Sequence, residues 1–115
     1  LAAPLKTQYA DNLILAGDAA RHVNSITGGG IHTALSSGKI AGEFLAALIN
    51  SGKPCTKNNL RGYQDQWLES MGNSMWKLYR TKKKIFDTRD IERRDEMLYA
   101  TMAGYFSTDS EYKKI

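Results

Sequence analysis

The sequence predicts a mostly α-helical piece of an α/β fold, in which a strand, a glycine-rich loop and a helix are followed by two more helices. Three observations lead to this prediction. An apolar run at residues 12–16 ends in Gly17. Three consecutive glycines, Gly28, Gly29 and Gly30, directly precede a long helical pattern. The second half of the chain then repeats apolar residues every three or four positions, which is the spacing of one helix face.

The strand is expected at residues 12–16, where every side chain after Asn12 is apolar. Continuous apolar character, as opposed to alternation, indicates a strand covered on both faces, as in a parallel sheet. Residues 1–11 mix polar residues with Pro4 and look irregular. We therefore expect the strand to find no partner within this chain.

The first helix is expected at residues 31–50, where apolar residues recur at helical spacing. Gly38 and Gly42 form a strip of small residues within it. Each glycine costs about 1 kcal/mol of helix stability relative to alanine, so we expect compensation by close approach of a strand or a ligand. Residues 51–54, Ser-Gly-Lys-Pro, are expected to end this helix.

The second half predicts a long helix over residues 58–86, in which Gly62 and Gly72 bend the chain without ending the helix. Residues 87–90 combine a break with helix-capping side chains, and a further helix is expected from Ile91 to residues 104–107. The stripe Trp67, Met71 and Met75 is interpreted as packing. We therefore divide the chain into residues 1–52, with the strand, loop and helix, and residues 53–115, a helical segment.

Size and composition exclude several classes of function. At 115 residues there is room for one small domain. The net charge of +4 is spread over both halves with acidic residues interleaved, which is not the pattern of a nucleic-acid-binding surface, so no nucleic acid is expected as a partner. A single cysteine, Cys55, excludes an internal disulfide, and no metal site is expected. The apolar stretches are too short to span a membrane, so the expected location is cytoplasmic, with any membrane contact peripheral.

The candidate site lies between the strand and the first helix. Asp18 follows the strand end, where ligands bind in open α/β sheets, and the glycines expose backbone N–H groups at a helix start. A carboxylate acceptor beside such donors can hold a polyhydroxylated or electron-accepting ligand. The alternatives are a turn aspartate, a glycine loop without a ligand, and a capping role for Thr27.

The same residues resemble a known family. Gly17-Asp18-Ala19-Ala20, followed about ten residues later by Gly-x-Gly-Ile, looks like the second flavin-binding motif of the para-hydroxybenzoate-hydroxylase-like flavoproteins. The full string, Gly-Asp-Ala-Ala-Arg-His-Val-Asn-x-x-Thr-Gly-Gly-Gly-Ile, most closely resembles the geranylgeranyl reductase family. The close match covers residues 12–42. It implies that the predicted α/β fold is a flavoprotein fragment.

The resemblance implies FAD as the cofactor. Asp18 would accept a hydrogen bond from a ribityl hydroxyl, and the glycine loop would lie against the pyrimidine end of the flavin ring, where its N–H groups and the helix dipole stabilise negative charge. The implied cofactor-binding residues are Gly17, Asp18, Thr27, Gly28, Gly29, Gly30 and Ile31. Ser25 stands where the family usually has proline, which leaves the loop less rigid.

The first FAD motif of this class, Gly-x-Gly-x-x-Gly, is absent, and the sequence starts at Leu1. We therefore expect a C-terminal portion whose partner is the missing N-terminal part of the same protein. The resemblance implies reduction of isoprenoid lipid double bonds. An aromatic monooxygenase, an electron-transfer dehydrogenase and a non-catalytic helical interaction module remain open.

Two other groups of residues invite functional assignments. His22 could donate a proton, although a loop histidine is more often a surface or hydrogen-bonding group, and Cys55 has no partnered base nearby in the sequence. A basic patch at Arg80 and residues 82–84 lies beside Phe86 and two other aromatic residues. It could contact phospholipid or a prenyl-lipid phosphate, but a solvated helix end, where lysines suit the helix dipole, is the favoured interpretation.

Overall fold

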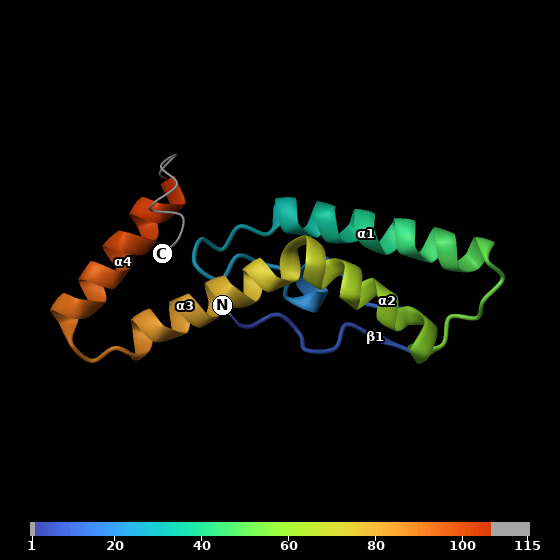
Figure 1. The fold of residues 1–115 in the computed structure, drawn as a ribbon, viewed down its shortest axis with the longest axis horizontal. Coiled ribbons are helices and arrows are strands. Elements are labelled where there is room, and N and C mark those ends of the chain that lie inside the picture. Colours follow the sequence, from blue (N-terminus) through green and yellow to red (C-terminus); the bar gives the residue numbers. More distant parts are fainter. Residues whose placement is uncertain (1, 107–115) are drawn as a thin grey trace. The chain divides into compact units, whose positions relative to one another are not determined.

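A computed structural model describes residues 2–106 (Figure 1). They divide into two compact units, one up to Tyr79 and one from Arg80 onward. In chain order the elements are the strands β1 (Tyr9–Ala10) and β2 (Leu13–Ile14), the 3-10 turn η1 (Gly17–Ala20), the helices α1 (Ile31–Asn50) and α2 (Lys57–Trp67), the π-helical turn η2 (Leu68–Gly72), and the helices α3 (Asn73–Asp87) and α4 (Ile91–Phe106). The structure is therefore mostly helical with a small sheet, which confirms the predicted fold class.

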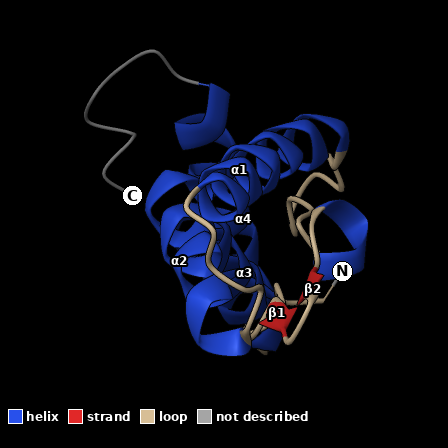
Figure 2. Ribbon diagram, turned by 90° about the vertical axis from the view of Figure 1, so that its right-hand side faces the viewer, coloured by secondary structure: helices blue, strands red, loops and turns tan. Residues whose placement is uncertain are grey.

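The sheet is a small antiparallel hairpin, with Tyr9 opposite Ile14 and Ala10 opposite Leu13 (Figure 2). Its tight turn contains Asn12, which has a left-handed φ of 57°, a conformation that asparagine tolerates better than most residues. The expectation of a longer strand, covered on both faces and without a partner, is wrong for the described residues. Leu13 is 49% exposed, and the segment expected to be irregular supplies the partner strand.

Helix α1 has the predicted bounds. At its end, the Gly52 N–H donates to the Ile49 carbonyl with a φ of 73°, so glycine supplies the left-handed residue that terminates the helix. The buried residues of α1 are Ser37, Ala41 and Leu48.

The glycines of α1 do not face this buried side. Around Gly38 and Gly42 the described residues leave open space, so the expected close approach at these positions is not made within them. Close approach occurs instead at Gly17, where a Cβ would lie 3.3 Å from the Ala34 Cβ. The sequence pattern identified small residues on α1 but not which of them face the rest of the unit.

The predicted long helix is present as α2, η2 and α3, which follow one another without a break from Lys57 to Asp87. Gly72, at the end of the π-helical turn, packs against the Trp67 ring so closely that a Cβ would overlap the indole. The expectation that Gly62 and Gly72 do not end this helix is confirmed, and η2 interrupts the α-helical geometry at Gly72. Trp67 and Met75 are buried, which confirms the packing interpretation of their stripe.

The core of the first unit lies between α1 and α2, which run side by side in Figure 1. Leu60, Tyr63 and Trp67 are at most 1% exposed. The Tyr63 hydroxyl donates to the Leu15 carbonyl at 2.8 Å, and its burial raises the pKa of Tyr63 to about 12. The N-terminal segment is thereby fixed to α2.

Gln64 on α2 fixes the same segment a second time. Its side-chain oxygen accepts from the Gln8 backbone N–H at 3.0 Å, and its side-chain nitrogen donates to the Lys6 carbonyl at 2.7 Å. A polar side chain at the edge of the core thus pairs with backbone groups of Lys6 and Gln8, while the Gln8 carbonyl accepts from the Leu15 N–H at 2.8 Å.

The break before α4 occurs where the sequence predicts it, and α4 ends at Phe106, within the expected range. The proposed division of the chain into residues 1–52 and 53–115 stays a prediction. Residues 107–115 of the second segment lie outside the described residues. Within the described part of the chain, no helix is long and apolar enough to cross a membrane.

The contact between Gly72 and Trp67 gives a stability prediction. Gly72→Ala forces the indole or the helix to move and should lower the free energy of unfolding by roughly 1–3 kcal/mol, measured by urea denaturation. Gly38→Ala is the matched control, because its Cβ meets open space and the helix gains about 0.5–1 kcal/mol. Equal effects of the two substitutions would contradict the packing that we describe.

Candidate functional site

The site is built on Gly17, which joins the hairpin to the 3-10 turn η1. Gly17 has a φ of 63°, and its N–H donates to the Ser37 hydroxyl of α1 at 3.0 Å. Both the conformation and the close contact with Ala34 favour glycine here. This contact holds η1 against the first turns of α1 and so determines where the next residue, Asp18, lies.

Asp18 is exposed, and its carboxylate lies beside the start of α1. The carboxylate oxygen Oδ1 would be 3.1 Å from a Cβ built on Gly30. Among the residues that the structure describes, none donates a hydrogen bond to this carboxylate. Asp18 is therefore an available acceptor, and Gly30 leaves the space that the carboxylate occupies.

The loop before α1 is held by Asn24. The Asn24 side-chain oxygen accepts from the N–H groups of Ile26 and Thr27 at 2.9 and 3.1 Å. The Gly28 N–H donates to the Asn24 carbonyl at 2.8 Å, and the Asn24 N–H donates to the Gly29 carbonyl at 2.9 Å. Residues 24–29 are closed into a compact turn, which gives the loop order despite the missing proline at position 25.

Thr27 does not cap α1. Its hydroxyl accepts from the Gly29 N–H at 3.2 Å, within the loop. The N-cap of α1 is Gly30, which has no side chain to accept from the first-turn N–H groups, and Ile31 is 82% exposed. The first turn of α1 therefore keeps unpaired donors and the positive end of the helix dipole beside Asp18.

The structure thus brings together Gly17, Asp18 and Gly30, and places Ile31 directly after them. Thr27, Gly28 and Gly29 lie in the preceding loop and are exposed. An acceptor beside uncapped helix donors suits a ligand that carries hydroxyl groups and an electron-rich carbonyl, which is the chemistry of FAD. The residues present fit that cofactor, on an open surface of the first unit.

His22 is fully buried, so its interpretation as a surface residue is wrong. Its ring stacks on Trp67 of α2 with a centroid distance of 4.4 Å and an interplanar angle of 15°. Its backbone N–H donates to the Gly17 carbonyl at 3.0 Å, and its carbonyl accepts from the Thr33 hydroxyl of α1. His22 therefore connects η1, α1 and α2.

Burial lowers the pKa of His22 to about 4, so the ring is neutral at physiological pH. Neither ring nitrogen has a hydrogen-bond partner among the described residues. A ring enclosed in this way holds the site in place and is not positioned as an exposed proton donor. The apolar stripe that contains Trp67 indicated a buried helix face. The helical spacing did not indicate that His22 packs against Trp67.

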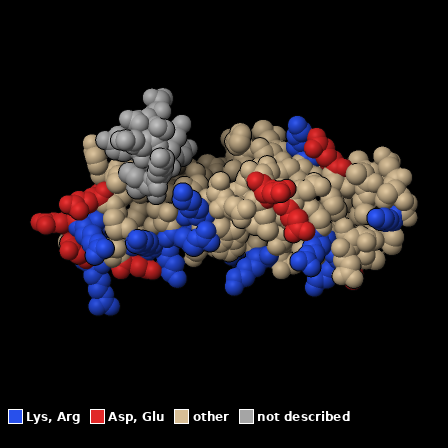
Figure 3. All heavy atoms as spheres, in the orientation of Figure 1, with Lys and Arg blue, Asp and Glu red and all other residues tan. Residues whose placement is uncertain are grey.

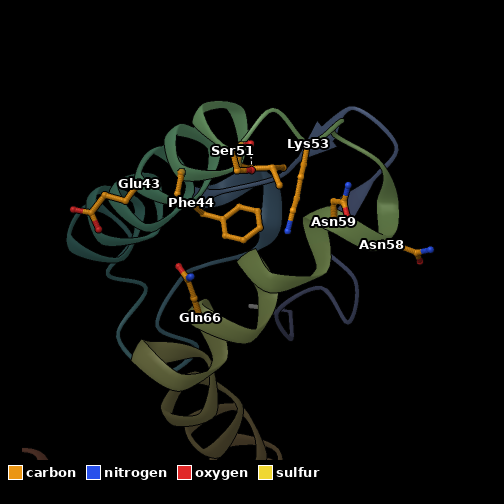
Figure 4. Close-up of a pocket in the computed structure, with 9 residues that line it drawn as sticks. Glu43, Phe44, Ser51, Lys53, Asn58, Asn59 and Gln66 are labelled. Carbon is orange, nitrogen blue, oxygen red and sulfur yellow. Dashed lines mark hydrogen bonds between the residues drawn. The ribbon is translucent and has the colours of Figure 1, made fainter.

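A groove lies at the other end of α1, between α1 and α2, with a volume of about 590 Å³ (Figure 4). The Lys53 side chain reaches into it, and the Phe44 ring forms part of its wall. Gly62 makes room for this ring, since a Cβ there would lie 2.8 Å from the Phe44 Cε2. This groove could not be predicted from local sequence patterns, because its residues come from both helices and the loop between them.

No metal site is formed by His, Cys, Asp and Glu side chains within residues 2–106. Cys55 is half-buried and free. Its backbone carbonyl accepts from the Asn12 N–H at 2.8 Å, so the described contact of Cys55 supports the hairpin turn.

Comparison with known proteins tests the family resemblance. No family model matches the chain. A digeranylgeranylglycerophospholipid reductase 2 of Methanopyrus kandleri is 42% identical over 89 residues, which are 77% of this chain and 22% of that protein. Proteins of the same name from Methanosphaera stadtmanae and Methanothermobacter thermautotrophicus are 40% and 36% identical over 76% and 83% of the chain. The sequence matches the geranylgeranyl reductase family.

The family resemblance that the Gly-Asp and glycine motifs implied is thereby confirmed. The chain spans about a fifth of the length of these geranylgeranyl reductase relatives. Nothing in the comparisons tests the individual site residues, so their cofactor roles stay predictions.

The buried His22 predicts a pH dependence of stability. The unfolded chain binds a proton near pH 6.5 and the folded chain only near pH 4, so stability is lost as the pH falls through this window, by about 3 kcal/mol in total. Urea denaturation at pH 7 and pH 4.5 measures the loss. In His22→Phe, which keeps an aromatic ring against Trp67, this part of the loss should disappear. The same loss in both proteins would show that another group is responsible.

Proposed function

We propose that this chain is part of an FAD-dependent oxidoreductase that saturates double bonds of an isoprenoid glycerophospholipid. The observation that carries the proposal is the position of the Asp18 carboxylate beside Gly30 and the uncapped first turn of α1. The names of the relatives supply the reaction and the substrate class, since they are digeranylgeranylglycerophospholipid reductases.

In this proposal Asp18 accepts a hydrogen bond from a hydroxyl of the ribityl chain. The unpaired N–H groups at the start of α1 face the pyrimidine end of the ring, where fixed dipoles stabilise the negative charge of the reduced state, while the N–H groups of Gly28 and Gly29 are used within the loop. Bound FAD supplies the hydride that reduces the alkene. Gly28, Gly29 and Gly30 keep side chains away from the flat ring. The proton donor is not assigned to this chain.

The N-terminal part of the same protein is the proposed partner that completes the site. The outward side of α1 supports this, because Ile31, Leu35 and Ile49 are 82%, 72% and 62% exposed at helical spacing. Gly38 and Gly42 lie between them with open space around both. An apolar stripe of this length on a helix suits packing against further polypeptide.

The comparisons favour the reductase over the alternatives. A monooxygenase or an electron-transfer dehydrogenase could use a similar Gly-Asp turn, and an interaction module would not need it. The three relatives described above all carry reductase names.

The cofactor assignment predicts the effect of Asp18→Ala in the intact protein. Loss of a hydrogen bond to a charged acceptor should weaken FAD binding roughly 10- to 100-fold. FAD occupancy after purification is read from absorbance at about 450 nm. Asp65→Ala removes an exposed carboxylate from α2 and serves as the control. Full occupancy in Asp18→Ala would remove the assignment.

A matched pair of glycine variants tests the same geometry without changing charge. A Cβ on Gly30 would lie 3.1 Å from the Asp18 carboxylate, whereas a Cβ on Gly29 would lie 3.4 Å from the Thr27 hydroxyl, which is ordinary contact. Gly30→Ala should therefore lower FAD occupancy more than Gly29→Ala. The reverse order would contradict the placement of the carboxylate.

The substrate class is tested with the dithionite-reduced intact protein and an unsaturated digeranylgeranyl glycerophospholipid. Mass spectrometry should show a gain of two hydrogens for each double bond reduced. Heat-inactivated protein is the control for reduction by dithionite itself. An unchanged lipid, with an aromatic substrate hydroxylated in its place, would favour the monooxygenase alternative.

A further inference from the structure

The turn that joins α3 to α4 presents two large apolar side chains to solvent. Phe86, near the end of α3, is 68% exposed, and Ile91, the first residue of α4, is 62% exposed. They lie on either side of the same short connection. Exposed apolar side chains that flank one connection between helices suit a contact surface.

This turn is ordered by its own hydrogen bonds. The Thr88 hydroxyl donates to the Lys84 carbonyl at 2.7 Å, at the end of α3, and lies 3.9 Å from the Met97 sulfur on α4. The Asp90 carboxylate accepts from the Arg93 N–H at 3.2 Å and caps the start of α4. The two apolar side chains are therefore presented by a defined backbone, so a partner need not order the turn.

Basic side chains lie on α3 just before this turn. Arg80, Lys83 and Lys84 are spaced by three and four residues, so they lie on one side of α3, and all three are exposed. The described residues give none of the three a carboxylate partner. Residues 80–91 contain five basic and two acidic residues. Figure 3 shows Lys and Arg side chains gathered over the α3–α4 part of the surface, with Asp and Glu side chains beside them.

We propose that residues 80–91 form a docking surface for an anionic phospholipid membrane. Phe86 and Ile91 enter the boundary between headgroups and acyl chains, while Arg80, Lys83 and Lys84 pair with phosphate groups. Aromatic and aliphatic anchors beside cationic side chains are the combination that binds such an interface. Positive charge exceeds negative charge over residues 80–91, and the described residues give Arg80, Lys83 and Lys84 no carboxylate partner, which favours an anionic lipid surface over an apolar protein groove. The surface shares no residue with the Asp18 turn, so its test does not depend on flavin binding.

The test is sedimentation of the intact protein with vesicles of phosphatidylcholine containing roughly 30 mol % phosphatidylglycerol. Lys83→Ala with Lys84→Ala should weaken binding roughly 10- to 30-fold, since each basic residue near an anionic surface contributes about fivefold. Phe86→Ser should weaken binding by roughly tenfold and, unlike the lysine variant, should do so at high salt as well.

The control is Lys39→Ala with Lys53→Ala, which removes the same charge from exposed positions of the first unit. It should bind within about twofold of the unchanged protein. The midpoint temperature of thermal unfolding must agree among all variants, and FAD occupancy provides a second check of folding. The proposal would be overturned if the control lost as much binding as the Lys83 and Lys84 variant. It would also be overturned if the unchanged intact protein did not bind these vesicles.

Discussion

The close contact between Gly17 and α1 is the constraint on which the rest of the site depends. A positive φ at Gly17 turns the chain, the Ser37 hydroxyl accepts its N–H, and the Ala34 side chain leaves no room for a Cβ. The turn is thereby fixed to the first turns of α1. Asp18 follows directly, so its carboxylate reaches the one neighbouring position, Gly30, where a side chain would obstruct it. The acceptor and the helix donors become neighbours through backbone geometry.

A second set of contacts, made by His22 and Trp67, supports this arrangement. His22 joins the turn and α1 through its backbone, and joins α2 through its ring on Trp67. Gly72 lets the indole lie beneath the π-helical turn. The buried side chains of Gln8, His22, Ser25 and Trp67 all retain polar atoms without a protein partner among the described residues. Such atoms are usually satisfied by ordered water, so we expect hydration around these side chains.

The sequence predicted what local chemistry determines. Helix α1 was placed correctly because its pattern starts after three glycines and stops at Ser-Gly-Lys-Pro, both of which act within a few residues. The continuous helical course through Gly72 was also predictable, since one glycine is a small local penalty. The turn at Gly17 and Asp18 was predicted as a cofactor site from its motif and not from packing, and the structure adds the contact between Asp18 and Gly30.

What the sequence could not reveal depends on contacts between distant residues. The direction and partner of β2 were missed because an apolar run does not state what it pairs with. The partnership of His22 and Trp67 spans 45 positions and has no signature in either local pattern. Which side of α1 is buried within the described residues could not be predicted either. Ser37 and Ala41 face inward while Gly38 and Gly42 do not, and small residues on adjacent positions do not distinguish these faces.

The exposure of Asp18 and of the first turn of α1 has a physical consequence for cofactor binding. In water, a carboxylate and a helix dipole interact only weakly with a ligand, because solvent competes for each hydrogen bond and screens each charge. The interactions of these groups with a ligand become much stronger once further polypeptide covers the site and excludes water. The Asp18 turn therefore supplies direction and chemical complementarity, whereas affinity requires enclosure. This division of roles explains why a turn so well ordered by Gly17, Asn24 and His22 can lie open on the surface of the described residues: its geometry is set locally, and its strength depends on what covers it.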